Sequence, residues 1–475
     1  MKFSRIIFFT SSALFAPLLF AQNNLPEAQI MSAKPITLLV DMPNLNAQNA
    51  PQPVHFSPQE LQHNPALLEG LLHSSIIQQN APLLQQLLPI YQQQAESDPI
   101  LVQFAQAKIA QLQGKFQLAI THFQQILAQH PTLNPVRIEL AIALFLDYQT
   151  RQAKIEFERA LNEKDTPNDV KMLISHYLAA IKKRESWQVS VSGGYLREKN
   201  VNKVSDNPII ENTAFVKGEK MRPIAARGAS FSLSFERQFN LHQHYFAQLE
   251  NQLFGKIYWN QHDFDDITNR TLFGFGYQSA NFRAALLPFY ERQWFAGQRY
   301  KKTQGARLEW QIALTPHWQL SHALEYGNNR YRNAHELNGN HKLASATLIW
   351  TSARHYLFAG VDYNLERSQK AQYSYDYYAI RAGFGRRLAF DIDSRVILSA
   401  AKRQYRDNLT LSALRFDKAR RDHFYSATLS IAKTNWQWLG ITPRLQLTWK
   451  QQRSNFASLY SYVDKNVNLF FEKSF

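Results

Sequence analysis

The chain has 475 residues, a formal net charge of +16, and aromatic side chains at 13% of its positions. It has no cysteine, which excludes a disulfide framework, a cysteine nucleophile or metal site, and a lipid anchor on an N-terminal cysteine. Basic, aromatic-rich chains can bind nucleic acid, but the basic residues here are scattered and form no arginine- or lysine-rich tract. We therefore expect no nucleic-acid partner.

The first 21 residues have the layout of a secretory signal peptide. Lys2 and Arg5 give a positively charged start, Ile6–Phe20 is apolar, and Ala21 offers a small residue for cleavage. The alternative is a transmembrane anchor, which requires about 20 apolar residues and fits this shorter stretch less well. We therefore predict an exported protein.

Residues 22–56 are rich in Asn, Gln and Pro. We predict a flexible segment there, because such a composition buries too little apolar surface to offset the entropy lost on ordering. The apolar patch Ile36–Val40 could instead dock on a partner or on a later part of the chain.

Residues 57–186 have helical character and an internal period of 34 residues, the period of the tetratricopeptide repeat. Ser57-Pro58-Gln59-Glu60 predicts a helix start, with a capping box and proline at the first helical position. Two or three such repeats form a curved solenoid whose concave side usually binds a peptide or protein. The alternative is an ordinary helical bundle with coincidental spacing. The period is carried by Ala119, Phe123, Ile126 and Leu127, which recur as Ala153, Phe157, Ala160 and Leu161, and by Ala107, which recurs as Ala141.

Residues 187–475 alternate apolar and polar side chains, a period of 2 instead of 3.6. In Pro443–Lys450 the odd positions are apolar and the even positions polar, so each set points to one face of a strand. About fourteen such runs follow one another, Thr442–Gln451 among them. Strands can span a membrane only as a closed barrel. The predicted fold class is therefore α plus membrane β, with tetratricopeptide-like helical repeats followed by an antiparallel transmembrane β-barrel of about 14 strands.

The predicted connections between strands alternate between long and short. Arg197–Arg227 and Trp259–Arg270 belong to the long class, and Asn240–His244, Ala280–Asn281 and Thr315–His317 to the short class. Outer-membrane barrels have short periplasmic turns and longer extracellular loops. With an even number of strands, both ends of the barrel and the attached repeats then lie on the periplasmic side. The long class continues with Phe295–Gly305, Asn328–His341, Arg406–Asp422 and Arg453–Lys465.

The two faces of the predicted strands differ in polarity, one apolar and suited to lipid, the other polar and facing a lumen. A barrel of this size is too wide for side chains alone to fill, so the lumen holds water, a plug or a passenger. Trp side chains near strand ends fit an interfacial girdle. The lipid-facing sets include Phe231/Leu233/Phe235, Leu308/Trp310/Ile312/Leu314, Leu357/Ala359/Val361/Tyr363 and Leu445/Leu447/Trp449. The lumen-facing sets include Ser232/Ser234/Glu236, Arg307/Glu309/Gln311, Arg381/Arg387, Ser426/Thr428/Ser430 and Arg444/Gln446/Thr448/Lys450.

The end of the chain alternates over Val467–Phe475 and stops on Phe475. This resembles the signal read by the bacterial barrel-assembly machinery, although Lys473 stands where that signal usually has an aromatic side chain. We therefore expect that machinery as a partner, together with outer-membrane lipids. Basic side chains in the predicted outer loops are expected to contact lipopolysaccharide phosphates. These side chains are Arg299, Lys301, Lys302, Arg415, Lys418, Arg420 and Arg421.

The sequence contains no recognisable catalytic motif: no Gly-rich phosphate loop, no His-Glu-x-x-His and no Gly-x-Ser-x-Gly. We therefore predict no enzyme, no catalytic, cofactor-binding or metal residues, and no cofactor. One cluster in a predicted outer loop, His262, Asp263, Asp265 and Asp266, could bind a cation. A solvated acidic loop is the simpler interpretation of it. The sequence singles out no client-binding residue.

The start of the barrel, Trp187–Asn202 (WQVSVSGGYLREKNVN), resembles the surface lipoprotein assembly modulators (Slam) of Gram-negative bacteria. The resemblance extends to the whole plan of signal peptide, tetratricopeptide repeats and C-terminal barrel. It implies an outer-membrane protein with its repeats in the periplasm. It also implies that the protein helps client surface lipoproteins, or secreted haem- or iron-binding relatives, to reach the cell surface.

The rival hypothesis is a polysaccharide exporter or a porin-like channel with a periplasmic repeat domain. Exporters of partly deacetylated poly-N-acetylglucosamine also join repeats to a barrel. They handle a cationic polymer, for which an acidic lumen is expected. The Arg-bearing inner faces of this chain count against that substrate and would suit an acidic polymer.

Overall fold

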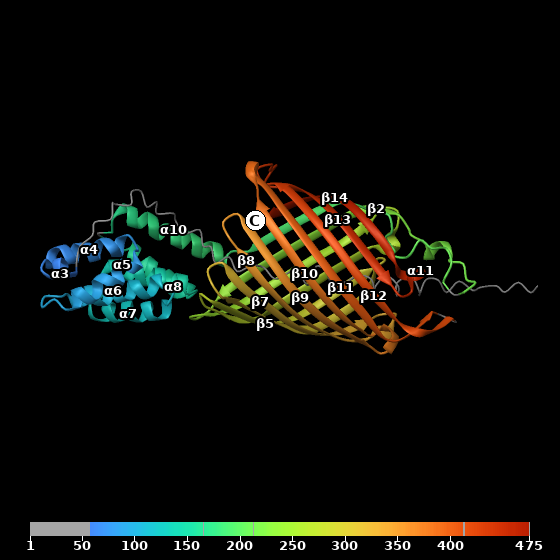
Figure 1. Cartoon of the computed structure of the whole chain (residues 1–475), viewed down its shortest axis with the longest axis horizontal. Helices are drawn as coiled ribbons and strands as arrows, with labels where there is room; N and C mark the ends of the chain where they lie inside the picture. The colour runs from blue at the N-terminus through green and yellow to red at the C-terminus, as the bar shows by residue number, and fades with distance from the viewer. Residues whose placement is uncertain (1–57, 165, 212, 412–413, 475) are drawn as a thin grey trace, which may run out of the picture.

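The computed structural model describes residues 58–474 apart from residues 165, 212 and 412–413. A group of helices leads into a closed β-barrel (Figure 1), which confirms the predicted fold class. The predicted signal peptide, the predicted flexible segment 22–56, Ser57 and Phe475 lie outside the described residues.

The helical part consists of helix pairs joined by short turns. Asn64 and Asn80 accept hydrogen bonds from backbone N–H groups in the first turns of α4 and α5, and Asp98 does the same for α6. Proline stands in the first turn of each of these three helices, where its missing N–H costs nothing. The bounds are α3 (Pro58–Gln62), α4 (Pro65–Ile77), α5 (Ala81–Gln92), α6 (Pro99–Leu112), α7 (Phe116–Gln129), α8 (Asn134–Leu146), α9 (Thr150–Leu161) and α10 (Asn168–Glu185).

The 34-residue period corresponds to the core of these helix pairs. Ala119 on α7 and Ala153 on α9 are fully buried, as are Phe123 and Phe157 one turn further on. The small side chain lets the paired helix approach, and the aromatic ring fills the space beside it. Tyr177 of α10 stacks on Phe157 with ring centroids 5.0 Å apart, so α10 covers the last repeat. The tetratricopeptide prediction is confirmed.

The barrel has fourteen antiparallel strands and closes through the pairing of β1 with β14. Each strand pairs with its sequence neighbour, so the sheet is an up-and-down meander. The bounds are β1 (Gln188–Glu198), β2 (Ala226–Asn240), β3 (Tyr245–Tyr258), β4 (Asp266–Gln278), β5 (Phe282–Phe295), β6 (Gln298–Ala313), β7 (Trp318–Tyr331), β8 (Gly339–Thr351), β9 (His355–Ser368), β10 (Tyr375–Arg387), β11 (Ile392–Leu411), β12 (Leu414–Lys433), β13 (Thr442–Ser454) and β14 (Tyr462–Ser474).

The barrel has a helix end, where α10 leads into β1, and a mouth end, where β1 leads into β2. The prediction of a long loop is wrong for two connections at the mouth end. Phe295–Gly305 is a tight turn at Ala296 and Gly297, whose φ values of 50° and 71° suit a two-residue hairpin. Arg406–Asp422 is mostly strand, because β11 and β12 have 20 residues each. About 9–11 residues span a membrane, so these strands extend beyond it, where neither face needs to be apolar and the alternation fades.

Candidate functional site

The barrel wall separates an apolar outer face from a polar inner face, as the sequence predicted. Leu308 on β6 is exposed at the outer face, whereas its neighbour Arg307 is buried on the inner side. The same contrast holds on β9, where Val361 is exposed and Asp362 is buried. Strand alternation therefore places the charged side chains in the lumen.

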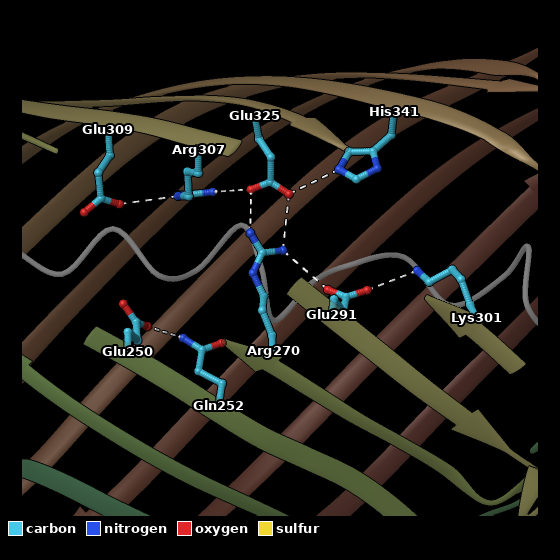
Figure 2. Close-up of polar contacts among 9 residues, drawn as sticks. All are labelled: Glu250, Gln252, Arg270, Glu291, Lys301, Arg307, Glu309, Glu325 and His341. Atoms are coloured by element: carbon cyan, nitrogen blue, oxygen red, sulfur yellow. Dashed lines mark hydrogen bonds and ion pairs between the residues drawn. The ribbon is translucent and has the colours of Figure 1, made fainter. Parts of the chain in front are cut away.

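Glu325 on β7 is the centre of the most connected group of lumen charges (Figure 2). Arg270 of β4 donates two hydrogen bonds to its carboxylate, at 2.8 and 3.2 Å. Arg307 of β6 donates a third at 3.1 Å, and His341 Nε2 of β8 lies 3.2 Å from Oε1. The Glu325 side chain is only 2% exposed. One carboxylate therefore joins strands that are not all neighbours.

The same network continues on both sides of Glu325. Arg270 also contacts Glu291 at 3.4 Å, and Glu291 pairs with Lys301 at 3.2 Å. On the other side, Arg307 contacts Glu309 at 3.3 Å. Charges removed from water are tolerated only with good partners, and removing one partner is strongly destabilising. We call this group the charge belt: Arg270, Glu291, Lys301, Arg307, Glu309, Glu325 and His341.

Separate ion pairs continue around the lumen wall beyond β8. Arg381 of β10 donates to Asp362 of β9 at 2.9 Å. Arg444 of β13 contacts Asp393 of β11 at 3.2 Å and Glu472 of β14 at 3.0 Å. The structure places Arg307, Arg381 and Arg444 on the inner face, as predicted, and pairs each of them with a carboxylate.

The long connection between β1 and β2 lies at the mouth end, where Figure 1 shows it beyond the strand ends. We call residues 199–211 and 213–225 the mouth segment. Its Val201 belongs to an apolar cluster with Tyr258 and Phe264, which lie in and beside the β3–β4 connection. Its Ile210 belongs to another cluster with Leu409 of β11 and other apolar residues. The mouth segment is thus held on both sides of the mouth.

The helix end of the barrel contacts the repeats through a few polar groups. Asp147, directly after α8, lies 2.8 Å from Nε2 of His244 in the β2–β3 turn. Asn240 of β2 donates to Glu185 of α10 at 3.3 Å. Arg184 of α10 donates to the carbonyl oxygen of Phe145 at 2.9 Å and lies over the Phe145 ring. Burial lowers the pKa of Arg184 to about 10. These contacts fix α8 and α10 to each other and to the barrel.

The suspected cation cluster is divided between two different roles. Asp265 accepts a hydrogen bond from the backbone N–H of Tyr258 at 2.7 Å and lies 2.9 Å from His262, so it closes the β3–β4 connection. Asp266 begins β4 and accepts from Gln293 at 2.8 Å. Asp263 lies in η2 (His262–Phe264). Within the described part of the chain, no three His, Asp or Glu side chains are grouped to hold a metal ion.

Two of the cations expected at the outer surface are inside the protein. Lys301 belongs to the charge belt through Glu291. Arg420 of β12 is buried, pairs with Asp422 at 2.9 Å and lies 3.5 Å from the ring centroid of Tyr460. Both were misplaced because the strands extend further than predicted. Exposed cations remain at the mouth end: Arg299, Lys302, Arg415, Lys418 and Arg421.

The sequence did not predict the charge belt as a whole, although it indicates one of the contacts within it. The turn predicted at Thr315–His317 places Arg307 opposite Glu325, and the observed register pairs these two residues. Arg270 lies on β4, three strands from β7, and no local pattern indicates that contact. Only the curvature of the closed wall brings it to Glu325.

Two family models match the chain. The model described as surface lipoprotein assembly modifier covers residues 187–475, and the model of that family's N-terminal TPR repeats covers residues 54–157. The chain is 31% identical to surface lipoprotein assembly modifier 1 of Haemophilus influenzae, covering 99% of this chain and 98% of the relative. It is 30% identical to the surface lipoprotein assembly modifier of Pasteurella multocida, covering 96% and 91%. It is 24% identical to the hemophilin secretion modulator of Acinetobacter baumannii, covering 87% of each chain.

Proposed function

The chain belongs to the surface lipoprotein assembly modifier family, and we propose that it is an outer-membrane translocator. It delivers surface lipoproteins, or related secreted haem- or iron-binding proteins, across the outer membrane to the cell surface. The observation that carries this proposal is the match of both parts of the chain, repeats and barrel, to one family. The hemophilin secretion modulator supports the inclusion of secreted clients. The proposal contains no catalytic step.

The repeats lie on the periplasmic side in this proposal. They contact the helix end of the barrel, where β2–β3 and β4–β5 are joined by short turns. Short turns are periplasmic in outer-membrane barrels. The mouth segment then faces the cell exterior. We further propose that the exposed cations at the mouth end contact lipopolysaccharide phosphates and that the barrel-assembly machinery inserts the barrel.

The charge belt supports a polypeptide client over an acidic polysaccharide. A lumen for an acidic polymer needs arginines with free charge, but Arg270, Arg307 and Arg381 are already paired with carboxylates. Because these charges are already paired, the wall presents no excess of either sign, which suits a chain of mixed composition.

Gene deletion tests the proposal. Each surface lipoprotein of the same organism is tagged and followed by protease shaving of intact cells, with and without this gene. At least one lipoprotein is expected to lose most of its surface exposure while its total amount stays constant, and the plasmid-borne gene restores it. An outer-membrane porin serves as the control for general envelope damage. Unchanged exposure of every lipoprotein and secreted haem-binding protein would overturn the proposal.

A further inference from the structure

The closure between β1 and β14 is incomplete at the mouth end. β1 pairs with β2 over its whole length, from Gln188 to Glu198. Among the described residues, its pairing with β14 runs from Ser190 to Tyr195, opposite Leu469–Ser474. In the part of β14 from Val463 to Asn468, the described strand pairing is with β13 and not with β1. We call this contact between β1 and β14 the seam.

Loop contacts, instead of strand pairing, hold the mouth end of the seam. The Lys217 amine of the mouth segment donates to the carbonyl oxygens of Ser205 at 2.8 Å and Ser458 at 2.6 Å. Ser458 lies in α11 (Ala457–Tyr460), directly before β14. The backbone N–H of Ser205 also donates to the carbonyl oxygen of Leu459 at 3.1 Å. These bonds fasten the segment that follows β1 to the helix that precedes β14.

The seam separates two very different environments. Val463 and Val467 of β14 are 51% and 64% exposed on the lipid side, next to the part of the strand that lacks β1. On the lumen side, Asn466 lies 2.8 Å from Asp464. An opening here would connect a polar lumen directly with the bilayer. Tight hydrogen-bonded pairing excludes such an opening at the other strand pairs.

A client with a lipid anchor requires an opening between the lumen and the bilayer. Acyl chains gain about 0.8 kcal/mol per methylene group from staying in hydrocarbon. The lumen wall is polar and contains ion pairs such as Arg381 with Asp362 and Arg444 with Asp393. A polypeptide can pass such a wall, whereas its lipid anchor is far more stable in the bilayer beside the barrel. The two parts of one client can travel together only through a lateral slit.

We propose that the seam is a lateral gate. It unzips from the mouth end, where pairing already stops at Tyr195, and the lipid-modified N-terminal segment of the client passes through it with its acyl chains in the bilayer. Contacts between Lys217 and Ser458 hold the gate shut at rest. Burial lowers the pKa of the Lys217 amine, but nearby Asp206 opposes this effect. This inference rests on the proposed function.

A disulfide across the seam tests the gate, and the absence of native cysteine makes the experiment specific. Tyr195 and Leu469 form the last pair of the seam, and both side chains face lipid. The double variant Tyr195→Cys/Leu469→Cys locks the gate under oxidation. The matched control Leu445→Cys/Leu469→Cys uses the same cysteine at the same depth, but ties β14 to β13. Single-cysteine variants control for loss of the native side chains.

The readout is surface exposure of the lipoprotein client found by the deletion experiment. A derivative of that client is compared in parallel, with its lipidated cysteine replaced and a non-lipoprotein signal peptide added. Oxidising the seam pair is expected to reduce delivery of the lipidated client at least tenfold, and a reductant is expected to restore it. The control pair and delivery of the non-lipidated derivative should be unaffected.

The other outcomes separate the two proposals. Normal delivery of the lipidated client with a fully oxidised seam would overturn the gate and leave the translocator function intact. A block of both client forms would overturn the assignment of the seam to the lipid anchor. If the unmodified protein itself delivers no client, the proposed function fails and the gate fails with it.

Discussion

The helical repeats and the barrel bury opposite kinds of side chain. In the repeats the fully buried side chains include Phe123 and Phe157, and charge is admitted mainly at contacts such as Lys108 with Glu139 at 2.9 Å. In the barrel the exposed side chains include large apolar ones such as Leu308 and Val361, and Arg270 and Glu325 are among the buried ones. The repeats are therefore stabilised chiefly by the hydrophobic effect and close packing. The barrel interior depends on complete pairing of charges, and its order is more sensitive to the loss of a single partner.

The largest effect is expected from Glu325→Gln. The substitution preserves volume but leaves Arg270, Arg307 and His341 around a neutral amide, so it should destabilise the barrel by about 3–5 kcal/mol. The measurement is urea unfolding of the refolded barrel in detergent, followed by heat-modifiable mobility on gels. Glu309→Gln is the matched control, because Glu309 is more exposed and a smaller loss is expected. Equal losses of stability in the two variants would mean that Glu325 contributes no more to the barrel than Glu309 does.

Ala153→Val tests whether the repeats depend on close apolar packing, in contrast to the charge pairing of the barrel. Two added methyl groups at a fully buried position, where two helices approach, should cost about 1–3 kcal/mol through overpacking. Thermal melting of helical circular dichroism should shift, while the heat-modifiable mobility of the barrel stays normal. Ala179→Val on the exposed side of α10 reports the helix propensity of valine alone. A barrel that fails together with the repeats would contradict the independence of the two parts.

The connection between the two parts is tested by His244→Ala. Losing the contact with Asp147 should weaken docking of the repeats by about 1 kcal/mol, a hydrogen-bond-sized effect. Limited proteolysis near the junction between Glu185 and Gln188 should then be several-fold faster in membranes. His242→Ala in the same turn is the control, since His242 is exposed. Identical cleavage rates would show that the two parts are fixed by other contacts.

The smallest effect is expected from Lys217→Met. Methionine keeps much of the apolar stem of lysine but removes both hydrogen bonds to the mouth segment and α11. The closed barrel should remain stable, and cells should become modestly more sensitive to vancomycin, which a closed mouth excludes. Lys220→Met, an exposed neighbour in η1 (Glu219–Met221), is expected to behave as the unmodified protein. Equal vancomycin sensitivity of both variants would show that Lys217 does not contribute to closing the mouth.

Several features could be predicted because they depend on local periodicity. The recurrence of Ala119 and Phe123 as Ala153 and Phe157 fixes the helix pairs, because the same contact is made in each repeat. Alternation such as that of Arg444 to Trp449 fixes strand identity and face, since successive side chains point to opposite sides. The hairpin register that joins Arg307 to Glu325 also follows from a short turn. The resemblance of Trp187–Asn202 to the Slam family added the proposed function, which periodicity alone does not contain.

Other features are visible only in the tertiary structure, because they depend on contacts between distant parts of the chain. Phe295–Gly305 was predicted to be a loop, because its strands extend beyond the membrane, where neither face needs to be apolar and the alternation fades. Arg270 reaches Glu325 from three strands away only because the wall curves into a closed barrel. The short seam between β1 and β14 joins opposite ends of the barrel sequence, and its register is set by closure instead of by any turn. Local patterns thus determined the strands and helices, and long-range closure determined the charge belt, the mouth and the gate.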